Sequence, residues 1–82
     1  MMTIGQILER VIHIVKRHGY ETETYSNHLV VYGSEFKADI TVIDDNIIII
    51  ETRGFPRDKI KIVKVKDLIM KSDDEISELL GI

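Results

Sequence analysis

Carboxylates are the residues of this 82-residue chain with the clearest capacity for chemistry. They gather in a central stretch, between residues 39 and 51, and in a C-terminal stretch, between residues 73 and 75. Hard divalent cations prefer oxygen ligands, so the two stretches predict a Ca²⁺ or Mg²⁺ site. The candidate metal ligands are Asp39, Asp44, Asp45, Glu51, Asp73, Asp74 and Glu75.

The same acidic residues also have a purely structural interpretation. Asp44-Asp45-Asn46 is typical of a tight turn, because such side chains bond to nearby backbone groups. Ser72 followed by Glu75 predicts a capping box at the start of a helix, where the helix dipole also favours acidic residues. The spacing of an EF-hand loop is absent from the chain. Ion binding and turn or cap chemistry therefore both stay open.

The loop of a central hairpin decides whether Asp39 and Glu51 can act together. A three-residue loop over residues 44–46, with Asn46 left-handed, sets Asp39 against Glu51 on one side of the sheet, about 5 Å apart at Cβ. A two-residue loop sets Asp39 against Thr52 instead, because a slip of one residue turns every side chain to the opposite face.

Two carboxylates directly opposite each other destabilise a sheet. In the three-residue register, a proton, a bound cation or the neighbouring Lys37 and Arg53 must relieve the repulsion. A divalent cation would relieve it while gaining hard oxygen ligands.

Residues 39–53, DITVIDDNIIIIETR, resemble the core of the PD-(D/E)XK nucleases, such as archaeal Holliday junction resolvases. In that family an acid precedes a hairpin whose second strand carries acid-x-Lys, and a helix and a further strand follow. The resemblance implies that Asp39 and Glu51 hold Mg²⁺, that the third motif position helps to activate water, and that Glu9 matches a helix acid of some members. Arg53 replaces the motif Lys, and Ala38 replaces a Pro. Arg cannot lose its proton, so Arg53 differs from the motif Lys in this respect.

A third candidate is a basic strand. Tyr32 or Phe55 beside a row of cations could track a phosphate backbone. The alternative is an edge strand that lysines protect from aggregation, and the formal net charge of −3 favours this alternative. The cations concerned are Lys59, Lys61, Lys64, Lys66, Arg53 and Arg57.

The remaining reactive residue types form no motif. The chain has no Cys, so it has neither disulfides nor thiolate ligands. His13, His18 and His28 do not have the spacing of a zinc site, and no serine lies in a nucleophile elbow. We therefore expect a small binding or accessory domain rather than an enzyme, with a degenerate nuclease-like module as one alternative.

The elements that must position these residues follow from periodicity. A helix is predicted over 4–18, with a Thr3–Gln6 capping box and a left-handed stop at Gly19. Strands are predicted at 20–25, 29–32, 36–43, 47–53 and 60–66, with a loop at 54–58. A change of parity in the last strand predicts a bulge or a break near residues 62–63. The last helix begins at Ser72 and ends at Gly81.

This order, α-β-β-β-β-β-α over residues 1–82, predicts a single α+β domain with an antiparallel meander of four or five strands. The run Ile47–Ile50 is apolar on both faces of its strand, so both faces of the sheet must be covered. Either one helix covers each face, or both helices share one face and the other face meets a partner subunit. The second arrangement predicts a homodimer that acts through a protein partner.

Composition adds broad expectations about where the protein works. Abundant Ile, Lys and Glu without Cys or Trp leans towards a thermophile. The absence of Cys and of a signal-peptide pattern predicts a cytoplasmic protein, and no stretch is apolar for long enough to cross a membrane.

Overall fold

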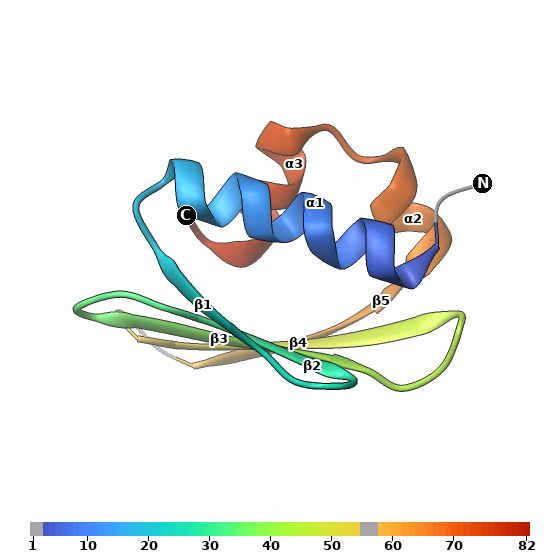
Figure 1. Ribbon diagram of the computed structural model, residues 1–82, viewed down its shortest axis with the longest axis horizontal. Coiled ribbons are helices and arrows are strands. Elements are labelled where there is room, and N and C mark those ends of the chain that lie inside the picture. Colours follow the sequence, from blue (N-terminus) through green and yellow to red (C-terminus); the bar gives the residue numbers. More distant parts are fainter. Residues whose placement is uncertain (1–2, 55–57) are drawn as a thin grey trace.

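The computed structural model describes residues 3–54 and 58–82 and shows the predicted α+β fold, with a five-strand antiparallel meander between helical termini (Figure 1). The elements in chain order are α1 (Ile4–Arg17), β1 (Glu21–Thr24), β2 (His28–Tyr32), β3 (Phe36–Val42), β4 (Ile47–Gly54), β5 (Lys59–Lys64), α2 (Val65–Met70) and α3 (Asp73–Leu80). Most of the loop predicted at 54–58 lies outside the described residues.

Both long helices begin and end as their sequences predict. The side chain of Thr3 accepts a hydrogen bond from the Gln6 amide, and the Gln6 side chain bonds back to the Thr3 amide. Ser72 and Glu75 form the same reciprocal pair at α3. Gly19 and Gly81 follow the helices with φ of 89° and 80°, a left-handed conformation in which residues other than glycine are strained.

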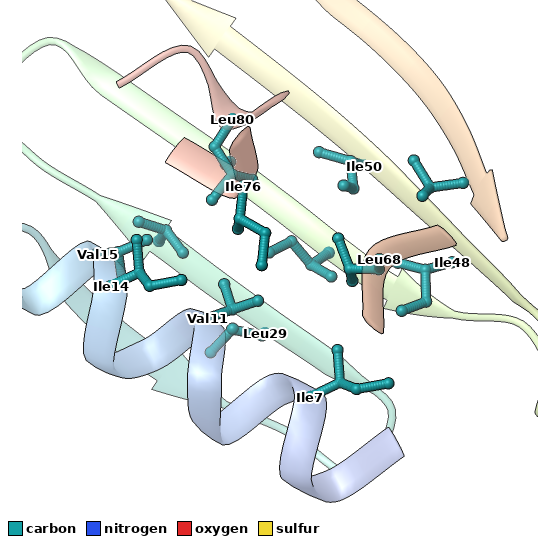
Figure 2. Close-up of a cluster of buried hydrophobic side chains, with 14 of the residues drawn as sticks. Ile7, Val11, Ile14, Val15, Leu29, Ile48, Ile50, Leu68, Ile76 and Leu80 are labelled. Carbon is teal, nitrogen blue, oxygen red and sulfur yellow. The ribbon is translucent and has the colours of Figure 1, made fainter. Parts of the chain in front are cut away.

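The sheet runs in the order β1-β2-β3-β4-β5, and α1, α2 and α3 lie on the same face of it (Figure 1). We call this the covered face and the other the open face. Side chains from all three helices meet those of the sheet in one apolar core (Figure 2). The labelled core residues are Ile7, Val11, Ile14, Val15, Leu29, Ile48, Ile50, Leu68, Ile76 and Leu80.

The isoleucine run of β4 divides between the two faces. Ile48 and Ile50 are buried under the helices, whereas Ile47 and Ile49 point to the open face. The arrangement with one helix on each face is therefore wrong. The helices share one face, which is the case that predicts a partner on the other.

The last predicted strand is shorter than expected. It ends at Lys64, and residues 65–70 form helix α2, which the apolar alternation did not predict. No bulge interrupts β5, since its pairing with β4 is regular from Ile47–Lys64 to Thr52–Lys59. The parity changes because Ile60 and Ile62 point to the open face while Val63 points to the core. Val65 then belongs to the helix, where it is buried with Leu68.

Candidate functional site

The hairpin has the register that brings two predicted ligands together. Asp39 pairs with Glu51, and the Ile43 amide donates to the Ile47 carbonyl at 3.0 Å, which closes the predicted three-residue loop. The prediction that Asn46 adopts a left-handed conformation is wrong, because no residue other than glycine has a positive φ in the described segments. Instead, Asp44 Oδ1 accepts the amides of Asn46 and Ile47 at 2.7 and 3.0 Å, so its side chain holds the turn.

Donors surround the facing carboxylates on the open face. His28 Nε2 lies 2.8 Å from Asp39 Oδ1, and Lys37 Nζ lies 3.9 Å from Asp39 Oδ2. Arg53 Nη2 lies 4.0 Å from Glu51 Oε2. Lys37 and Arg53 thus stand where the sequence requires cations to relieve the repulsion. Only 15% of the Asp39 side chain is exposed, which makes its hydrogen bond to His28 the best shielded of these contacts.

His28 is the member of this site that the sequence did not identify. It begins β2, and Val30, two residues later, pairs with Asp39, so His28 and Asp39 are diagonal neighbours on the open face. In the tautomer that carries a proton on Nε2, His28 donates this hydrogen bond to the Asp39 carboxylate. The sequence places His28 at a strand start, but its partner depends on the register of β2 against β3.

Two tyrosines extend the site towards the β1 edge. The Tyr25 ring stacks on His28 with 5.8 Å between centroids, and its hydroxyl donates to Glu23. That hydrogen bond raises the pKa of Tyr25, and burial raises the pKa of Tyr32. Together with Lys37 and Asp39 these residues line an open concavity of about 490 Å³. Its wall carries both charges and aromatic faces, which suits binding of a polar group.

The second acidic group is tied to the helix layer. Arg10 bonds to Asp73 Oδ1 through Nε and Nη2, and Arg17 Nη2 bonds to Asp73 Oδ2 at 2.9 Å. The Arg10 contacts, followed by those of Arg17, lower the pKa of Asp73. Hydrogen bonds from Ser72 lower the pKa of Glu75. A cation would have to displace two guanidinium groups at Asp73.

The two acidic groups do not meet. Asp45 lines a mostly apolar concavity of about 890 Å³, together with Ile4 and Gly5 from the first turn of α1. Asp73 instead contacts α1 at Arg10 and Arg17, several residues further along that helix. Asp74 and Glu75 follow Asp73 in the first turn of α3. Within the described segments, no three His, Asp or Glu side chains are placed to hold a metal ion together.

The other residues that the nuclease resemblance implied lie apart. Glu9 is exposed on α1 near His13, and α1 packs on the covered face. Asp39 and Glu51 point to the open face, so the sheet separates them from Glu9. β4 is followed by the antiparallel neighbour β5, whereas that family has an intervening helix there.

The basic strand does not present one continuous row. β5 is an edge strand, as the alternative interpretation predicts. Lys61 lies on the covered side, where its ammonium donates to the Leu79 carbonyl at 3.1 Å. Lys64 lies on the open side, and Lys66 belongs to α2. Arg57 and Phe55 lie outside the described residues.

A serine–histidine pair occurs between α1 and α3. Ser77 Oγ lies 3.2 Å from His18 Nε2 and donates to the Asp73 carbonyl at 3.0 Å. Because Ser77 is buried and its proton is committed to the backbone, the pair joins two helices rather than presenting a nucleophile.

The open face also carries an exposed apolar surface. Ile43, Ile60 and Ile62 are 54%, 70% and 72% exposed. Ile47 and Ile49 lie between them on β4, and the register places Ile62 beside Ile49. We call these five residues the isoleucine patch. Polar side chains usually occupy the solvent face of an antiparallel sheet, so the isoleucine patch departs from the usual pattern.

Comparisons of the chain with protein-family models, with curated proteins and with solved structures each find no match. Across the described part of the chain, every helix is too short or too polar to span a bilayer.

Proposed function

We propose that the protein is a small binding or accessory domain that acts through the open face of its sheet. The observation that carries this proposal is the isoleucine patch on a sheet whose helices all lie on the other face. The neighbouring charged groups give the same face polar contacts beside its apolar ones. Specific protein interfaces combine these two features, an apolar centre and a polar rim.

Site-specific photo-crosslinking in the native cells tests this proposal, whichever protein the partner is. A photoreactive residue replaces Ile62 on the open face in one variant. In the control it replaces Lys16, which is exposed on α1. We expect discrete crosslinked protein products from position 62 and none from position 16. Absence of products from position 62, in a protein that circular dichroism shows to be folded, would contradict the proposal.

A divalent-cation site at Asp39 and Glu51 is the second candidate function. The observation in its favour is the direct pairing of the two carboxylates on the open face. Lys37, Arg53 and His28 compete with a cation there, so the proposal requires these side chains to move aside. Titration with Ca²⁺ and Mg²⁺ should shift the amide resonances of residues 39 and 51, but not in Asp39→Asn. Unchanged resonances at millimolar ion would exclude the site.

The nuclease-like alternative uses the same pair and has its own test. Branched DNA incubated with Mn²⁺ should be cleaved by the wild type, and Asp39→Ala and Glu51→Ala should each abolish cleavage. Cleavage that survives both substitutions would exclude this pair as the catalytic site.

A further inference from the structure

We infer that the occupant of the open face is a second copy of this chain, packed sheet against sheet in a symmetric dimer. The inference rests on the proposed function, because it names the partner of the same surface. In such a dimer, the isoleucine patch of each protomer forms half of a central apolar layer. Two facing sheets with interdigitated side chains make a stable core about 10 Å thick.

The area of the open face is close to the lower end of what a specific interface needs. Five strands about 4.8 Å apart, with about 3.3 Å per residue, make a face of roughly 450 Å² in projection. The accessible surface exceeds the projection, because side chains of different size make the face uneven. It therefore approaches the roughly 600 Å² per partner at which specific interfaces begin.

The charges at the two ends of the patch favour a second copy over an unrelated partner. Lys64 lies beside Ile47 at one end, and Glu51, whose carboxylate Arg53 approaches to 4.0 Å, lies beside Ile60 at the other. When two copies meet with their β5 strands antiparallel, Lys64 of each protomer comes over the Glu51 end of its partner. Symmetry then creates two identical pairs of opposite charge, one on each side of the isoleucine layer.

The edges of the sheet are less suited to self-association. β1 is short, with Glu21 and Glu23 on the open side, and the β5 edge carries three lysines. Charged residues of one sign along an edge oppose pairing with another edge of the same kind. The lysines of β5 would repel one another across a two-fold axis, whereas the open face brings lysine to glutamate.

Sedimentation equilibrium of the full chain across micromolar to millimolar concentration tests the inference. We expect a wild-type dimer that Ile62→Glu dissociates, with a dissociation constant at least about 100-fold higher, because a charge enters the apolar centre. Lys64→Glu and Glu51→Lys should each weaken the dimer about tenfold, and the double charge swap should restore most of the loss. Lys16→Glu makes the same change in net charge as Lys64→Glu, on exposed α1, and should leave the dimer intact.

Each variant is checked for the wild-type circular dichroism spectrum, which substitutions at Ile62 and Lys64 should preserve because both are exposed. A wild-type mass of one chain at millimolar concentration would overturn the inference. Dimers unaffected by Ile62→Glu, or single charge changes that the double swap does not rescue, would also overturn it. If the purified chain is a monomer but position 62 crosslinks to a different protein in cells, the dimer fails while the proposed binding face stands. If position 62 crosslinks to nothing, both fail.

Discussion

The two faces of β4 present the same residue type in opposite circumstances. Ile48 and Ile50 point to the helices and are 0% and 2% exposed. Ile47 and Ile49 alternate with them, point away from the helices and remain partly exposed. Next to them on β5, Ile62 is 72% exposed, whereas Val63 is buried. A single strand pair thus has one face that builds the core and one whose isoleucines remain exposed.

This difference shows why the apolar content of a small domain does not by itself determine its stability. A buried isoleucine contributes about 1.5–3 kcal/mol to folding by leaving water, but an exposed one contributes little until something covers it. Because a chain of 82 residues has little apolar surface to spare, leaving five isoleucines on the open face is costly. Such a cost is expected where the surface serves a partner.

Truncation of matched isoleucines should show the largest contrast between the faces. We expect Ile48→Ala to lower the free energy of unfolding by about 2–5 kcal/mol, since it leaves a cavity in the packed core. Ile62→Ala should change it by less than about 0.5 kcal/mol at micromolar concentration, because its side chain is mostly in water. Urea unfolding followed by circular dichroism measures both. Equal losses would show that the open face is part of the folding core.

Larger side chains on β3 should also destabilise the protein more on the covered face than on the open face, but by a smaller difference in the free energy of unfolding. Ala38 is fully buried on the covered face, so Ala38→Ile should cost about 1–3 kcal/mol by overpacking. Thr41 lies on the open face opposite Ile49, where an ethyl group in place of the hydroxyl meets no helix. Thr41→Ile should therefore be nearly neutral or stabilising in the same urea experiment. A neutral Ala38→Ile would show that the covered face is loosely packed.

The ion contacts that hold α3 to α1 should have the smallest effect and a distinct pH dependence. The pKa of Asp73 is lowered by Arg10 and then Arg17, so the folded state binds its proton less tightly than the unfolded state does. The stabilisation is present above the unfolded pKa of about 3.9 and is lost as the pH falls through the folded value. Asp73→Asn should be less stable than the wild type at pH 7.

Thermal unfolding from pH 7 down to pH 2 checks this prediction. The midpoint of Asp73→Asn should converge with that of the wild type at the acid end. A constant difference over this range would contradict it. Asp73→Asn should leave the open face unchanged, because the Asp73 side chain bonds to Arg10 and Arg17 of α1, on the other side of the sheet.

Much of the fold follows from local patterns. The capping boxes at Thr3 and Ser72, the glycine stops and the alternation of β2 and β3 act within a few residues, so the sequence predicts them well. Helix α2 was not predicted, because Val65 continues the apolar alternation of β5 and so favours a longer strand. Val65 and Leu68, the buried residues of α2, are three positions apart, which is a helical spacing. The side on which the helices pack depends on tertiary contacts between distant segments, so local patterns do not decide it.

The candidate site was predictable in part for the same reason. The sequence limits the hairpin loop to two alternatives, and the observed one is the three-residue loop that pairs Asp39 with Glu51. The contact between His28 and Asp39 depends on a second register, that of β2 against β3, and escaped prediction. The pairing of Asp73 with Arg10 joins residues 63 positions apart and has no local signal.

The most direct test of the difference between the two faces is a dilution series followed by the methyl resonances of selectively labelled isoleucines. On dilution from millimolar to micromolar concentration, the methyl groups of Ile43, Ile60 and Ile62 should shift as the open face becomes exposed. Those of Ile7, Ile48 and Ile76 should stay unchanged, because they are buried in the core at every concentration. Open-face methyl resonances that do not depend on concentration, or covered-face resonances that move in their place, would contradict the account.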